Sequence, residues 1–209
     1  MFDLYGLGEK VNFAKFDPFK CCREPANGYI SDLVASLKEA HLTTPLSQYA
    51  KATKSIYTWI FLSKVVAVFN LTHGEIFRIT PQDPIVGQYG RGPVDYSINI
   101  PASGTVVVIT EVQREDYDTG IAQNMVQIES VTAGKKREIE DTDAGMEATD
   151  AEEPIERCFG IVTDVRSWIF LEHTRRDGKI KFKLSEQQYI VSQQLKGTKR
   201  CVFYLILTT

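Results

Sequence analysis

Two acidic side chains and a glutamine occupy positions in this chain from which they could hold a divalent cation together. Asp95 begins one run of β-branched and apolar residues, and Glu111 and Gln113 end the next such run. A short turn with Pro101 and Gly104 separates the runs, which predicts an antiparallel β-hairpin. Both acids then lie at one end of the hairpin, and residues two apart share a face. Carboxylate oxygens suit Mg²⁺ or Mn²⁺, so the sequence predicts a metal site, with Gln113 placed to orient a water.

Length and composition predict a folded protein with its own core. The chain has 209 residues, of which 43% are hydrophobic and 11% aromatic, enough for one domain of generous size. The longest apolar stretch, residues 56–69, is interrupted by Ser63 and Lys64. It is too short to cross a bilayer, and the first residues do not resemble a signal peptide. The four cysteines lack the spacing of a zinc site, so we expect reduced cysteines, an intracellular protein and no membrane partner.

The formal net charge of −3 hides an uneven distribution of charge. Residues 138–156 contain nine acids and no Lys or Arg. The remaining 18 acids are outnumbered by 24 basic residues, so the rest of the chain is mildly basic and compatible with a nucleic-acid partner. The composition of residues 138–156 predicts a solvated acidic loop. An alternative left open is that this segment mimics phosphate and covers a basic groove.

The pattern along the chain predicts two parts. Residues 1–70 form an irregular and helical region that packs on the core, with helices at about 31–41 and 45–70. Residues 71–209 form the main domain. Its first predicted elements are a strand over 74–80, a Pro/Gly-rich loop over 81–92 and the hairpin described above.

The second half of this domain is predicted to contain more strands than helices. Apolar residues at helical spacing predict a helix from about residue 118 to a stop at Gly134. Further elements follow: strands over 158–163, 168–174 and 179–184, a helix over 185–195 and a buried strand over 201–208. The resulting order of helix, three strands, helix and strand is α/β in character, and it is the order expected of a restriction-endonuclease-like core, a mixed central sheet flanked by helices.

Three segments carry a resemblance to known proteins. Asp95 followed by Glu111-Val-Gln113 resembles the motif of the PD-(D/E)xK phosphodiesterase superfamily. The phrase Gly90-Arg-Gly-Pro-Val-Asp-Tyr96, the Glu-Val-Gln strand and the helix from Gly120 to Gln127 together resemble the nuclease-like domains of Crinkler-type proteins of fungi and oomycetes. The resemblance covers residues 74–184.

The resemblance implies specific roles for the residues of the motif. Asp95 and Glu111 would bind Mg²⁺ or Mn²⁺, and Gln123 would add a polar group from the helix that follows. Gln113 stands where the superfamily usually has a lysine, and a glutamine can hold a water but supplies no positive charge to the phosphate. Two functions therefore stay open: a metal-dependent nuclease, and a catalytically impaired module that binds nucleic acid or a host protein.

Basic residues suggest how such a protein would hold its partner. Arg91 and Arg114 flank the motif, and Lys179, Lys181 and Lys183 alternate along one strand face. These lysines form a plausible series of phosphate contacts, although solvated edge strands also use lysines. We expect nucleic acid, in the first place DNA, as the partner, and a homodimer stays open. The resemblance also implies action in a host nucleus.

Overall fold

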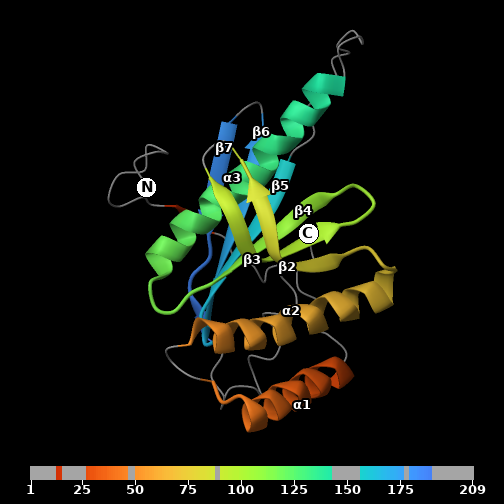
Figure 1. Cartoon of the computed structure of the whole chain (residues 1–209), viewed down its shortest axis with the longest axis vertical. Helices are drawn as coiled ribbons and strands as arrows, with labels where there is room; N and C mark the ends of the chain where they lie inside the picture. The colour runs from red at the N-terminus through yellow and green to blue at the C-terminus, as the bar shows by residue number, and fades with distance from the viewer. Residues whose placement is uncertain are drawn as a thin grey trace.

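The computed structural model describes residues 13–15, 27–46, 50–87, 90–142, 156–176 and 179–189. Within these residues the chain forms an eight-stranded mixed sheet and three helices (Figure 1). In chain order the elements are β1 (Ala14–Lys15), α1 (Asn27–Thr43), α2 (Lys51–His73), β2 (Arg78–Val86), β3 (Arg91–Ile100), β4 (Thr105–Val112), α3 (Tyr117–Thr142), β5 (Glu156–Thr163), β6 (Ser167–Arg176), β7 (Lys179–Leu184) and β8 (Gln188–Tyr189). The strand order is β1-β7-β6-β5-β4-β3-β2, with β8 beside β6. The prediction of an α/β protein is confirmed.

The helices cover the two faces of the sheet, as Figure 1 shows with α1 and α2 on one side and α3 along the sheet. Side chains alternate between faces along a strand. On β4, Val108 and Val112 belong to the apolar cluster that contains α2, whereas Ile109 belongs to the cluster that contains α3. The parallel pairing of β4 with β5 requires a crossover, and α3 supplies it. The core is therefore divided into two apolar layers with the sheet between them.

Helix α2 is the core helix of the first layer. Among the described helices only α2 has the length and mean hydropathy, 1.3, of a membrane-crossing helix, which is weak evidence because core helices share these properties. Leu62 and Val65 are fully buried and belong to the apolar cluster that also contains strand residues such as Val108. Ile56, Trp59 and Leu71 are exposed on the same helix.

Strand β2 corrects the prediction of a loop over 81–92. The strand continues through Pro81 and Pro84 to Val86. Proline has no N–H to donate, so strands contain it mainly at the edge of a sheet, where one side has no neighbouring strand to accept a hydrogen bond. Strand β2 is the last strand of the sheet. The register passes from Pro81 opposite Tyr96 to Asp83 opposite Val94 without a shift, so Gln82 lies opposite Asp95 at a break in the ladder of pairs.

Two further boundaries differ from the prediction. Helix α3 continues past Gly134 to Thr142, because one glycine costs only about 1 kcal/mol and the Lys, Arg and Glu that follow are good helix formers. The first residues of the predicted helix 185–195 include the short strand β8 instead. Most of the acidic segment, residues 143–155, and the predicted strand 201–208 lie outside the described residues.

The close packing of α3 on β5 makes the first testable prediction. A Cβ atom on Gly160 would lie 1.9 Å from Oδ1 of Asn124, and Asn124 Nδ2 donates to the carbonyl oxygen of Ile109 at 3.1 Å. We expect Gly160→Ala to lower the free energy of unfolding by about 1–3 kcal/mol, the usual effect of overpacking, measured by urea denaturation. Gly28→Ala is the control, since nothing lies within 4 Å of that added Cβ in α1. An unchanged urea midpoint for Gly160→Ala would contradict this packing.

Candidate functional site

The two predicted metal ligands lie where strands β3 and β4 separate. The pairing of β3 with β4 ends at Tyr96 opposite Thr110, while β4 stays paired with β5 as far as Val112 opposite Thr163. Beyond the last β3–β4 pair, the N–H of Val112 donates to Oδ2 of Asp95 at 2.8 Å. A side-chain carboxylate thus replaces a backbone carbonyl as the acceptor, and the strands form a fork.

The structure brings Asp95 and Glu111 together at this fork. Both residues are buried, with exposed fractions of 7% and 1%. Burial raises the pKa of Glu111 to about 7, and the negative charge of Asp95 and a hydrogen bond between the two carboxyl groups raise it further, while a hydrogen bond from Gln127 and the charge of Lys51 lower it. Two acids in contact in a buried place resist double ionisation unless a cation joins them.

Helix α3 reaches the site through Gln127 rather than through Gln123. Gln127 Nε2 donates to Oε1 of Glu111 at 2.6 Å. Gln123 lies one turn earlier on α3 and, within the described part of the chain, makes no hydrogen bond to either carboxylate. The sequence indicated that both glutamines share a helix face, but the distance of each from the fork depends on where α3 crosses β4.

Helix α2 reaches the same site from the other side of the sheet. Lys51 Nζ forms an ion pair with Oδ2 of Asp95 at 2.8 Å. One turn later, the buried Lys54 Nζ donates to the carbonyl oxygen of Arg114 at 2.5 Å, which ties the start of α2 to the chain just after β4. Sequence analysis did not identify either lysine, because their distance from the motif along the chain carries no signal of contact.

Strand β2 adds a third polar group to the site through Gln82. Gln82 has a φ of 51°, in the left-handed region that non-glycine residues seldom adopt. Its Nε2 lies 3.4 Å from Oδ1 of Asp95. Residues held in such a sparsely populated backbone conformation are often found at functional positions.

Gln113 occupies the third position of the motif, one residue beyond the end of β4. A Cβ atom on Gly120 would lie 2.5 Å from Cγ of Gln113 and 2.8 Å from Cγ1 of Val162. The glutamine side chain therefore packs over the first turn of α3, next to β5. Among the described residues it makes no hydrogen bond to Asp95 or Glu111.

The donor set of the fork fits a hard divalent cation. Besides the two carboxylates, Oε1 of Gln127 is buried and has no hydrogen-bond partner among the described residues. No group of three or more His, Cys, Asp or Glu side chains occurs within the same described residues. Mg²⁺ commonly binds one or two carboxylates and completes its shell with water and substrate phosphates, so the pair Asp95 and Glu111 is sufficient for it.

The predicted lysine contacts lie far from the fork. Phe182 and Leu184 pack with the α3 cluster, so the alternate residues Lys181 and Lys183 face the opposite side of the sheet from α3. Strand β7 is three strands from β4, about 14 Å across the sheet. Lys179 begins the same strand, and Lys183 forms an ion pair with Glu172 at 2.8 Å.

The two predicted arginine contacts flank the fork from exposed positions. Arg91 is exposed at the beginning of β3, opposite Val86 of β2. Arg114 is also exposed and follows Gln113, and its carbonyl oxygen accepts the hydrogen bond from Lys54. Within the described residues, neither guanidinium forms an ion pair with Asp95 or Glu111.

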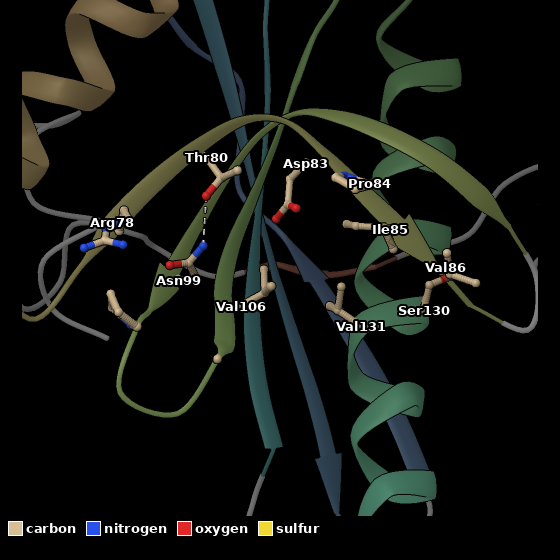
Figure 2. A pocket seen from close by; sticks show the side chains of 12 residues that line it. Arg78, Thr80, Asp83, Pro84, Ile85, Val86, Asn99, Val106, Ser130 and Val131 are labelled. Carbon is tan, nitrogen blue, oxygen red and sulfur yellow. Dashed lines mark hydrogen bonds between the residues drawn. The ribbon is translucent and has the colours of Figure 1, made fainter.

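A groove of about 600 Å³ lies over β2, β3 and β4 next to α3 (Figure 2). Arg78, Thr80 and Asn99 line its polar end, and Asn99 Nδ2 donates to Oγ1 of Thr80 at 3.1 Å. Ser97 donates to the lining residue Asp83, and Ser97 shares a strand face with Asp95. The lining residue Asp83 also lies opposite Val94, the residue before Asp95.

Fold and site together define a mixed α/β protein with a buried carboxylate pair at a strand fork. No family model matches the chain. The chain is 34% identical over 194 residues to Crinkler effector protein 1 of Rhizophagus irregularis. This similarity covers 90% of the chain but only 39% of the length of that relative. It supports the Crinkler-like relationship that the sequence motifs indicated.

The raised pKa of Glu111 makes stability depend on pH. The pKa is about 7 in the folded protein and has an ordinary value of 4.5, so the folded state holds this proton more tightly. Stability therefore falls as pH rises from about 4.5 to about 7 and stays reduced above. Without divalent metal, we expect Glu111→Gln to melt above wild type at pH 8, by a margin that shrinks toward pH 4.5.

The exposed Glu115 provides the matched control for this measurement. Glu115→Gln removes the same charge without relieving a buried pair, so its melting temperature should follow wild type across the pH range. A difference between Glu111→Gln and wild type that does not change with pH would contradict the raised pKa.

Proposed function

We propose that the chain is a metal-dependent phosphodiesterase of the PD-(D/E)xK type that acts on DNA. One observation carries the proposal: two buried carboxylates from neighbouring strands meet at a fork of the sheet. The order α2, β2, β3, β4, α3, β5 is the element order expected of a restriction-endonuclease-like core. Asp95 and Glu111 lie on the second and third of these strands, as the motif requires.

The residues of the site have complementary parts in such a reaction. A bound Mg²⁺ would polarise the scissile phosphate and lower the pKa of an attacking water. Asp95 and Glu111 would hold the ion, with Asp95 fixed by the N–H of Val112 and Glu111 by Gln127. The groove over β2 to β4 would hold the DNA strand, with Arg78 at its polar end.

The relationship to a protein named as an effector extends this proposal. We infer that the chain is the effector domain of a Crinkler-like protein and acts in a host nucleus. The similarity to only part of the relative is consistent with one domain of a longer protein.

A second candidate function is binding without catalysis. The observation that favours it is the packing of Gln113 over Gly120, with no ammonium at the third position of the motif. In this case the domain would bind nucleic acid or a host protein without metal. Dependence on divalent ions separates the two functions.

The direct test is cleavage of single- and double-stranded DNA in Mg²⁺ and in Mn²⁺. We expect slow cleavage by the wild type and a loss of roughly 10²-fold or more in Asp95→Ala and Glu111→Ala, because a metal supplies several kcal/mol of charge stabilisation. Glu115→Ala, at an exposed position four residues after Glu111, is the control and should cleave like wild type.

Two outcomes would count against this function. DNA binding without cleavage in either metal would favour the binding module. Cleavage that persists in both alanine variants would point to a contaminating nuclease and remove the support for this site.

The groove makes a separate prediction about affinity. Arg78 is exposed at the groove, so Arg78→Ala should weaken DNA binding in EDTA and reduce the slope of log K against log salt by about 1. Lys38→Ala removes an equal charge from the exposed face of α1 and should leave the slope unchanged. Fluorescence anisotropy at several salt concentrations measures both, and equal slopes for the two variants would exclude the groove as a DNA contact.

A further inference from the structure

We propose that Lys51, at the start of α2, supplies the positive charge to the substrate phosphate that Gln113 cannot supply. The inference rests on the proposed phosphodiesterase function and names a further catalytic residue for it. Lys51 Nζ lies 2.8 Å from Oδ2 of Asp95, and its side chain is 42% exposed. The ammonium therefore contacts a proposed metal ligand on one side and solvent on the other.

Lys51 is the first residue of α2, a position where a positively charged side chain is unfavourable. Helix N-termini prefer Asp or Glu because the positive end of the helix dipole lies there. The first turn of α2 has no acidic residue, includes Lys51 and Lys54, and has no side-chain cap from Ala50. A local preference that is broken in this way is typical of a functional position.

Three neighbouring contacts hold Lys51 at the fork. Lys54, one turn further along α2, is only 4% exposed and donates to the carbonyl oxygen of Arg114. Ser55 Oγ and the Tyr96 hydroxyl are 2.6 Å apart, and Tyr96 also donates to the carbonyl oxygen of Ser55. Residues 51 and 55 of α2 thus contact consecutive residues of β3, Asp95 and Tyr96, which fixes the helix register.

The other basic residues considered for this role lie elsewhere. Gln113 packs over Gly120, and Arg114 is exposed in the bend that follows β4. Arg91 is four residues from Asp95 along β3, about 13 Å in an extended strand. Lys181 and Lys183 lie on β7, three strands from β4. Among the described residues, Lys51 is the basic residue whose side chain forms an ion pair with one of the two carboxylates.

In the proposed hydrolysis, water oxygen bonds to phosphorus while the bond from phosphorus to the leaving sugar oxygen breaks. The water gives up one proton and the leaving oxygen takes one, so no electrons are exchanged with an oxidant or reductant. Lys51 keeps its proton throughout. A cation on Asp95 would replace the ion pair with Lys51, and the flexible four-carbon stem allows the ammonium to turn to a non-bridging phosphate oxygen.

The test compares Lys51→Met, Lys51→Arg and the control Lys64→Met, which removes a lysine from the same helix. Mn²⁺ affinity is measured by isothermal titration calorimetry, and kcat and KM on duplex DNA are measured at saturating Mn²⁺. We expect Lys51→Met to lower kcat by about 10²- to 10³-fold, the usual effect of losing one charge-stabilising donor, with Mn²⁺ affinity equal or tighter. Lys51→Arg should recover part of kcat, and Lys64→Met should match wild type.

Each other outcome overturns the inference in a distinguishable way. An unchanged kcat in Lys51→Met would show that Lys51 only neutralises Asp95 before metal binds, and the phosphodiesterase proposal would stand. Weaker Mn²⁺ binding or a lower melting temperature in both Lys51 variants would assign Lys51 a structural role. Absence of cleavage by the wild type would remove the phosphodiesterase proposal and this inference together.

Discussion

The hydrogen bond from the N–H of Val112 to the carboxylate of Asp95 is the interaction on which the site depends. A buried N–H without an acceptor costs about as much as a lost hydrogen bond. Because a side chain accepts this bond, β3 can leave β4 without an unpaired donor while β4 remains paired with β5. The resulting fork opens the end of the sheet, so that α2 from one face and α3 from the other reach the same two carboxylates.

The fork concentrates negative charge in a place where water is largely excluded. Asp95 and Glu111 are both buried, and two such acids oppose each other's ionisation. The surrounding residues offset this cost with an ammonium from Lys51 and an amide from Gln127. Strongly shifted acids with specific partners are typical of functional sites. Two well-packed apolar side chains at these positions would give the fold equal or greater stability.

Much of the fold could be predicted from local pattern. The hairpin of β3 and β4 and the helix that contains Gln127 were visible because periods of two and of 3.6 residues are properties of the chain itself. The prediction was wrong where tertiary context decides: Pro81 and Pro84 are compatible with a strand only because β2 is at an edge. Gly134 does not end α3, since a single glycine carries only a small penalty.

The sequence by itself determined that Asp95 and Glu111 lie at one end of a hairpin, since alternation and a short turn are local properties. Only the tertiary structure decided which groups meet them. Lys51 reaches Asp95 because α2 packs on the face beside β3, and Lys183 stays distant because β7 joins the sheet three strands from β4. Such contacts depend on how whole elements pack together, and side-chain spacing within one element carries no information about that packing.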